Sequence, residues 1–126
     1  MQYNRMSCLF NSLSHFYGES SESIRGRICD YLSTNPALYD DMDAATAALV
    51  ESGLPLDRYV ERMRSMGTWG GAIEIRAAVQ LWQRPVRVWA IRYKRWIEFP
   101  WTSGDVCCLS WTGGHYEPMT CVTESI

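Results

Sequence analysis

The hydrophobic pattern divides the chain into a helical first part and a strand-rich last part. Over residues 8–82, apolar side chains recur at three- and four-residue spacing, as on one face of an amphipathic helix. After Pro85 the apolar runs become short and are separated by polar or glycine-bearing turns, which is typical of β-strands. Helices first and an antiparallel-looking sheet later predict an α+β fold.

Capping and breaking residues set the expected bounds of these elements. Gly18, Gly53 and Gly67 are helix stops, the serines at 20–23 are good N-caps, and Asn35-Pro36 ends the second helix. The expected helices cover residues 8–16, 44–50, 56–66 and 72–82, and a further one begins within 20–23 and ends at 35. The expected strands cover residues 86–91, 96–99, 106–111 and 115–121.

Composition describes one ordinary globular domain over residues 1–126. The chain is 47% hydrophobic with a net charge of −2, and a chain of this size buries roughly two-thirds of its unfolded surface. It has no apolar run long enough to span a membrane and no secretory signal pattern. We therefore expect a soluble, cytoplasmic monomer that binds neither membranes nor nucleic acid.

Five cysteines form an odd-numbered set without repeated spacing, so a secreted disulfide framework is a poor interpretation and a reducing compartment is expected. Cys107 and Cys108 lie in an apolar run and are expected to be small core residues. A zinc site from Cys107, Cys108, His115 and Cys121 is a weak alternative, because adjacent strand residues point to opposite faces. No metal site is predicted.

Two segments at opposite ends of the chain carry candidate nucleophilic chemistry. Cys8 starts a predicted helix, where free N–H groups and the positive end of the helix dipole favour the thiolate. His115 follows two glycines, and strand alternation puts Glu117 on its face, so the carboxylate can orient the imidazole. For Cys8 alone, a buried helix cysteine is the competing interpretation. His15, the other histidine, is expected to be a surface or packing residue.

Three segments together resemble the motifs of ovarian-tumour (OTU) family cysteine proteases. They are Cys8-Leu9-Phe10, Trp69-Gly70-Gly71-Ala72-Ile73-Glu74 and Gly114-His115-Tyr116-Glu117. In that family the first heads a helix, the second is a tryptophan–glycine loop before another helix, and the third supplies a histidine. The resemblance spans nearly the whole chain and implies a papain-like OTU fold, with a small, mostly antiparallel sheet flanked by helices.

The resemblance also implies roles for residues of this chain. Cys8 would be the nucleophile, His115 the general base and then acid, and Glu117 would occupy a position usually held by Asp or Asn. The oxyanion hole would use backbone N–H groups of Cys8 and of Arg5 or Met6. The family's Asp-Gly-Asn before the cysteine is Arg5-Met6-Ser7 here, so this hole is expected to be shaped differently.

An OTU protease would hydrolyse the bond after the C-terminal Gly-Gly of ubiquitin or a ubiquitin-like modifier, without metal or cofactor. Two terminal glycines need a narrow channel, and the expected walls are Trp69, Gly70, Gly71, Trp111 and Gly114. Glu74 alone would be a solvated first-turn acid. Carboxylates for the arginines of the ubiquitin tail are available in one stretch, although a solvated helical face is its simpler interpretation: Asp40, Asp41, Asp43, Asp57 and Glu61.

Three alternatives stay open. The altered segment before Cys8 suits a ubiquitin-binding pseudoenzyme, although Cys8 and His115 are intact. The small size suits a viral protease that processes its own polyprotein by the same chemistry. A basic and aromatic cluster over residues 84–96 suits nucleic-acid binding, although charged residues at a hairpin turn ordinarily serve solubility. That cluster contains Arg84, Arg87, Trp89, Arg92, Tyr93, Lys94, Arg95 and Trp96.

Overall fold

The computed structural model describes residues 5–120, and its elements follow the predicted order. The helices are the 3-10 turn η1 (Arg5–Ser7), α1 (Cys8–Tyr17), α2 (Ser21–Ser33), α3 (Ala44–Ser52), α4 (Leu56–Met63) and α5 (Ala72–Trp82). The strands are β1 (Ala37–Tyr39), β2 (Met42–Asp43), β3 (Val86–Ala90), β4 (Arg95–Phe99), β5 (Cys107–Trp111) and β6 (Tyr116–Met119).

Helix ends lie within two residues of where the local sequence predicts them, except the end of α4. Gly18 and Gly53 end α1 and α3 in the left-handed conformation that glycine adopts without strain. Ser20 caps α2 by accepting a hydrogen bond from the Ser23 N–H. Helix α4 ends at Met63 rather than at residue 66, because the chain turns there into the loop that leads to α5.

The main sheet is mixed, and its strand order is β4-β3-β5-β6. Strand β3 pairs antiparallel with β4 and parallel with β5, while β5 and β6 are antiparallel. The α+β class is confirmed, but the antiparallel-looking order along the chain contains one parallel pair, because the segment after β4 carries the chain to the far edge of β3. A short hairpin of β1 and β2 was not predicted.

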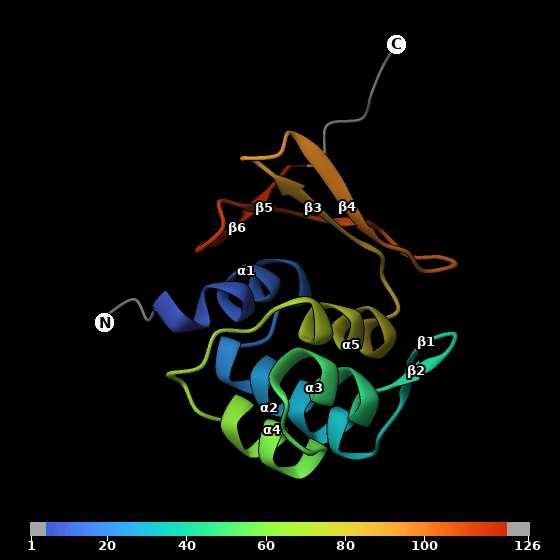
Figure 1. Ribbon diagram of the computed structural model, residues 1–126. Coiled ribbons are helices and arrows are strands. Elements are labelled where there is room, and N and C mark those ends of the chain that lie inside the picture. Colours follow the sequence, from blue (N-terminus) through green and yellow to red (C-terminus); the bar gives the residue numbers. More distant parts are fainter. Residues whose placement is uncertain (1–4, 121–126) are drawn as a thin grey trace.

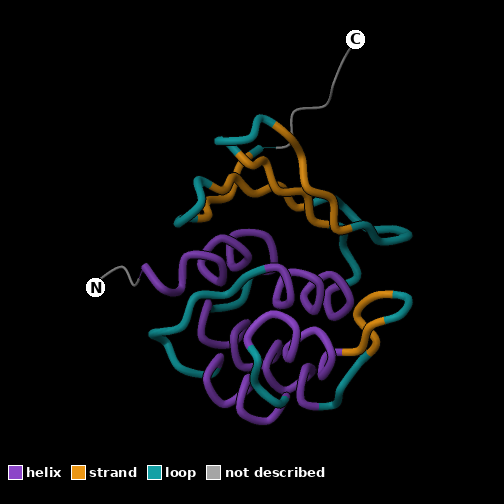
Figure 2. Tube along the Cα trace, in the orientation of Figure 1, coloured by secondary structure: helices purple, strands orange, loops and turns teal. Residues whose placement is uncertain are grey.

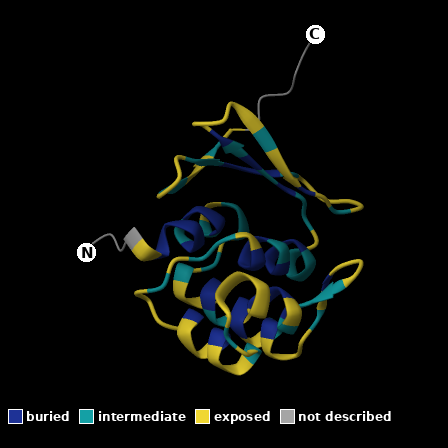
Figure 3. Cartoon of the chain, in the orientation of Figure 1, coloured by how far each residue is buried: buried dark blue, intermediate teal, exposed yellow. Residues whose placement is uncertain are grey.

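The sheet and the helices form layers (Figure 1). The sheet lies over α1 and α5, and α2, α3 and α4 lie on the other side of those two helices. In Figure 2 a long loop leads from α4 to α5 on the side where α1 begins. Buried positions gather where α1 and α5 face the sheet and where the helices face one another, as Figure 3 shows. No helix within residues 5–120 has the length and apolar character needed to cross a membrane.

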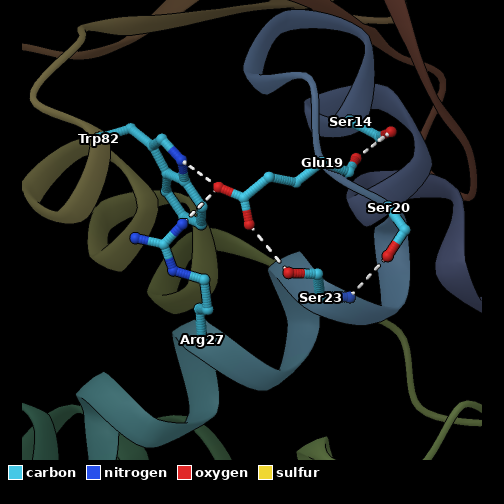
Figure 4. A network of polar contacts seen from close by, with 6 residues as sticks. All are labelled: Ser14, Glu19, Ser20, Ser23, Arg27 and Trp82. Atoms are coloured by element: carbon cyan, nitrogen blue, oxygen red, sulfur yellow. Dashed lines mark hydrogen bonds and ion pairs between the residues drawn. The ribbon is translucent and has the colours of Figure 1, made fainter.

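A polar network ties the turn between α1 and α2 to the end of α5 (Figure 4). The Glu19 carboxylate accepts hydrogen bonds from Ser23 Oγ at 2.9 Å and from Trp82 Nε1 at 3.2 Å, and it pairs with Arg27. The Arg27 guanidinium also lies 4.6 Å from the Trp82 ring centroid. This partly exposed network fixes the start of α2 relative to the end of α5.

Candidate active site

Cys8 is the first residue of α1 and its side chain is buried. The preceding residue, Ser7, is the N-cap but makes no side-chain hydrogen bond to the first helical turn. Across the interface with the sheet, the backbone N–H of Tyr116 points at Cys8 Sγ at 3.4 Å. The start of α1 therefore meets the start of β6, which brings together two segments 108 residues apart.

His115 directly precedes the amide that contacts the sulfur, and its imidazole is paired with Glu117. The two side chains approach to 3.3 Å between His115 Nε2 and Glu117 Oε2. The extra methylene of glutamate therefore does not prevent contact with the imidazole. Both side chains remain accessible to water, with 33% of the His115 side chain and 66% of the Glu117 side chain exposed.

A cavity of about 350 Å³ opens beside Cys8. The residues that the sequence assigns to a substrate channel all line this cavity together with Cys8: Trp69, Gly70, Gly71, Trp111 and Gly114. Trp69 is half exposed, while the Trp111 ring stacks on Tyr116 with centroids 6.3 Å apart. One wall of the cleft thus comes from the loop before α5, and the other comes from β5, β6 and their connection.

The two glycines of the first wall have different surroundings. A Cβ on Gly70 would lie 2.8 Å from Leu9 Cδ2 and from Phe10 Cζ, so the close approach of this loop to α1 requires glycine. A Cβ on Gly71 would meet nothing within 4 Å, as expected at an open surface. Gly70 therefore packs the wall against the helix that carries Cys8, while Gly71 leaves space beside it.

Glu74 anchors the same wall from the protein interior, and the prediction that Glu74 is a solvated acid is wrong. It is 1% exposed, accepts a hydrogen bond from the Gly71 N–H at 2.7 Å, and accepts another from Tyr59 Oη at 2.6 Å. Burial raises the pKa of Glu74 to about 7, although both hydrogen bonds act in the opposite direction. The sequence did contain a signal for this role: a glutamate at the third helical position after a glycine N-cap can reach back to accept a hydrogen bond from the N-cap amide.

The predicted acidic stretch is divided among several places. Asp43 caps α3 by accepting from the Thr46 N–H at 2.9 Å, and the exposed Asp57 and Glu61 on α4 do not line the cleft. Asp40 and Asp41 line a neighbouring hollow, which shares Ala72, Ile97 and Phe99 with the cleft. The carboxylate that lines the cleft itself is Glu51, at the end of α3, which the sequence did not single out.

The segment expected to form the oxyanion hole is held from inside the protein. Arg5 and Met6 belong to η1, directly before Cys8. The Met6 carbonyl accepts a hydrogen bond from Arg25 Nη2 at 3.2 Å. Because carbonyl and N–H of a trans peptide point in opposite directions, the N–H of Ser7 is turned away from Arg25.

The metal and nucleic-acid alternatives gain no support in the described residues. No group of three or more potential ligands within residues 5–120 could hold a metal ion, and Cys121 of the zinc hypothesis lies outside the described residues. Cys107 and Cys108 are both buried, as predicted. Cys107 is a free thiol, whereas Cys108 is disulfide-bonded, which the sequence analysis did not predict. Within the basic cluster, Arg87 pairs with Glu98 across the β3–β4 hairpin at 2.8 Å.

Comparison with known proteins identifies the family of this chain. The family model described as OTU-like cysteine protease matches residues 7–116, and this chain belongs to that family. A comparison with curated proteins finds no match.

Solved structures with this fold include OTU domains from several sources. One is an OTU domain in complex with ubiquitin, 23% identical, with a TM-score of 0.74 over 94% of this chain and 66% of that chain. The Hazara virus OTU bound to ubiquitin is 16% identical, with a TM-score of 0.70 over 95% of this chain and 80% of the other. An OTU deubiquitinase from Wolbachia pipientis wMel is 17% identical, with a TM-score of 0.67 over 94% and 84%. The chain thus spans slightly less than two thirds of the first neighbour, and the predicted OTU fold is confirmed.

Proposed function

We propose that this protein is a deubiquitinase that hydrolyses the isopeptide bond after the C-terminal Gly-Gly of ubiquitin. The observation that carries the proposal is the contact between the Cys8 thiol and the Tyr116 amide beside a glycine-walled cleft, with the Glu117-paired His115 next to that amide in the chain. Family membership supports cysteine protease chemistry, and two neighbours of the same fold are described as ubiquitin complexes.

The proposed reaction is acyl transfer through a thioester. The Cys8 thiol gives its proton to His115, and the resulting thiolate attacks the carbonyl carbon of the terminal glycine. With Nε2 held by Glu117, Nδ1 is the ring nitrogen that would accept this proton. His115 then protonates the departing lysine amine, and a water molecule, deprotonated by the same imidazole, hydrolyses the thioester.

The start of α1 supports this chemistry electrostatically. The Ser7 hydroxyl does not cap the first turn, so it does not compete with an oxyanion for the backbone N–H groups there. The Tyr116 N–H donates to Cys8 Sγ at 3.4 Å and so holds the sulfur at the start of β6.

The cleft also suits the sequence of the ubiquitin tail. Gly71 and Gly114 leave space where a Cβ would project, as a Gly-Gly terminus needs. Farther from Cys8, Glu51 lines the same cavity, and Asp40 and Asp41 line the next hollow. We assign Glu51 as the first partner for the arginines of the tail.

Hydrolysis of ubiquitin carrying a fluorogenic C-terminal amide tests the proposal. We expect turnover by the wild-type chain and none by Cys8→Ala, with circular dichroism showing that the variant folds. Binding of ubiquitin without turnover by the wild type would favour the pseudoenzyme instead. Turnover by Cys8→Ala at the wild-type rate would contradict the mechanism.

A further inference from the structure

Arg25 on α2 is a buried guanidinium in the middle of the helical layer. It is 2% exposed, and it is the largest of the fully buried side chains in the described residues. Its Nη1 donates to the carbonyl of Met63 at 2.8 Å and to the carbonyl of Thr68 at 2.9 Å. These two carbonyls bracket the loop between α4 and α5, so one nitrogen fixes both ends of the segment that leads into Trp69.

The other terminal nitrogen of Arg25 binds the segment before the nucleophile. Its Nη2 donates to the Met6 carbonyl at 3.2 Å and to Ser7 Oγ at 3.1 Å. The guanidinium also lies 4.2 Å from the centroid of the Phe10 ring. Gly70 packs on the same ring, since a Cβ there would lie 2.8 Å from Phe10 Cζ. Arg25 thus joins the start of α1 to the wall of the cleft.

The contact with Ser7 has a consequence for the first turn of α1. Serine at an N-cap ordinarily turns its hydroxyl to the N–H groups of that turn. Here Ser7 makes no cap bond and has φ −101° and ψ 13°, outside the extended conformation of a usual N-cap. Arg25 holds the hydroxyl and the preceding carbonyl on the interior side, which leaves the first-turn N–H groups unoccupied by Ser7.

Burying this cation is costly, because every hydrogen-bond acceptor that it contacts is neutral. Burial lowers the pKa of Arg25, although a guanidinium stays protonated in proteins. No carboxylate of the described residues forms a hydrogen bond with it, and its buried Nε has no partner there. An apolar side chain would avoid the desolvation cost but would leave the Met63, Thr68 and Met6 carbonyls without this donor, so what the guanidinium contributes here is its hydrogen bonds to these segments.

We propose that Arg25 is a positioning residue, which holds the segment before Cys8 and the Trp69 wall in the single arrangement that catalysis needs. The proposal rests on the proposed function, since it assigns Arg25 to the same site. Arg25 touches neither Cys8 nor the cleft in the contacts above, so it acts through Met6, Ser7 and the loop ahead of Trp69. Its two terminal nitrogens reach the two segments at once, which the single ammonium of lysine cannot reproduce in the same geometry.

The test compares Arg25→Lys and Arg25→Met with the same two substitutions at Arg27. Arg27 lies on the same helix two residues away, and its contacts are with Glu19 and Trp82 rather than with the segment before Cys8 or the loop before Trp69 (Figure 4). Each variant is measured at a temperature where circular dichroism shows it fully folded. The readouts are kcat and KM for the fluorogenic ubiquitin substrate, and the rate at which iodoacetamide alkylates Cys8.

We expect Arg25→Met to lower kcat by about 100-fold, the size seen when one oxyanion donor is lost, and Arg25→Lys to lower it by about tenfold. Alkylation of Cys8 should stay within about threefold of wild type, because the small reagent needs neither the oxyanion hole nor the wall. The Arg27 variants should keep kcat and KM within about twofold.

Two results would overturn the role. One is folded Arg25 variants whose kcat and KM match those of the Arg27 controls. The other is alkylation that falls in parallel with kcat, because the effect would then be on the thiol itself.

The role of Arg25 can be separated from the proposed function. If the wild-type chain does not hydrolyse ubiquitin, the proposed function fails, and amide hydrogen exchange then tests the positioning role alone. Faster exchange at both Ser7 and Gly70 in Arg25→Lys supports it, and exchange unchanged at either residue overturns it.

Discussion

The two sides of the cleft are held by different kinds of contact. On the side of α1 and α5, the anchors are two buried polar groups, Arg25 and Glu74, and each hydrogen-bonds to backbone beside the cleft. On the side of β5 and β6, the His115–Glu117 pair is open to water, and the wall is a stack of Trp111 on Tyr116.

This difference indicates how the site divides its tasks. A buried hydrogen bond is costly to break, so the nucleophile and the Trp69 wall are preorganised before substrate arrives. An exposed ion pair contributes little to stability and is screened by salt. Changes on the first side should therefore alter folding and activity together, and changes on the second should alter activity alone.

Gly70→Ala should have the largest effect. Its Cβ would lie 2.8 Å from the buried side-chain atoms Leu9 Cδ2 and Phe10 Cζ, so these packed side chains or the loop must shift. We expect a loss of about 2 kcal/mol in the free energy of unfolding, as for an overpacked core, and about 100-fold in kcat/KM. Urea denaturation and steady-state kinetics measure the two losses.

Gly71→Ala is the matched control, because a Cβ there meets nothing within 4 Å. It should fold with wild-type stability and raise KM by narrowing the passage for the substrate glycines. A Gly70→Ala protein as stable and active as wild type would show that this wall is not rigidly held.

Glu74→Gln should change how stability depends on pH. Burial raises the folded-state pKa of Glu74 from 4.5 to about 7, so between these values the unfolded chain has lost the proton that the folded chain keeps. The stabilisation that protonated Glu74 contributes to the folded state is fully present below pH 4.5 and decreases as the pH rises toward 7. Above pH 7 the free energy of unfolding is lower by about 3 kcal/mol than below pH 4.5. The substitution should remove this fall, as thermal unfolding across pH 4.5–8 would show.

The exposed Glu61 on α4 provides the control for that measurement. Glu61→Gln should leave the pH dependence as in wild type. If Glu74→Gln shows the same fall in stability as wild type, another group titrates in this window and Glu74 is not its source.

Glu117→Ala should lower kcat by about tenfold, because the imidazole loses the group that orients it while keeping its nitrogen atoms. Glu117→Gln, which keeps a hydrogen-bond acceptor, should lose less. Neither should change the melting temperature, given the exposure of the pair. A clear loss of stability in Glu117→Ala would contradict the distinction between the two sides, and full activity would move the orienting role to another residue.

Glu51→Gln should have the smallest effect. As an exposed residue at the edge of the cleft, it would meet a basic tail side chain in water. We expect KM for the ubiquitin substrate to rise about threefold at low salt, with kcat unchanged, and the difference to shrink at high salt. An equal KM at low salt would remove Glu51 from tail recognition.

Local patterns predict most of the helices and strands, because apolar spacing, caps and stops act over a few residues. The end of α4 was predicted three residues too late. The β1–β2 hairpin was missed, since strands of three and two residues carry almost no periodic signal. The parallel pairing of β3 with β5 was missed because it depends on where the chain returns, not on the strands themselves.

The buried anchors could not be predicted in the same way. Tyr59 and Glu74 are 15 residues apart, and Arg25 and Thr68 are 43 apart, so the partners that make burial tolerable are not neighbours in sequence. Cys8, His115 and Glu117 were found because their chemistry is legible from local sequence, and a resemblance then supplied their roles. The position of Glu51 on the cleft depends on how α3 packs, and the sequence alone does not show it.

The central claim is that Cys8 is a nucleophile aimed at the C-terminus of ubiquitin. Incubating the chain with ubiquitin that carries an electrophilic C-terminus, followed by intact mass and peptide mapping, tests it directly. We predict one covalent adduct, located on Cys8, and none with Cys8→Ala. No adduct with the folded wild-type chain, or an adduct that persists in Cys8→Ala on Cys29 or Cys107, would contradict the account.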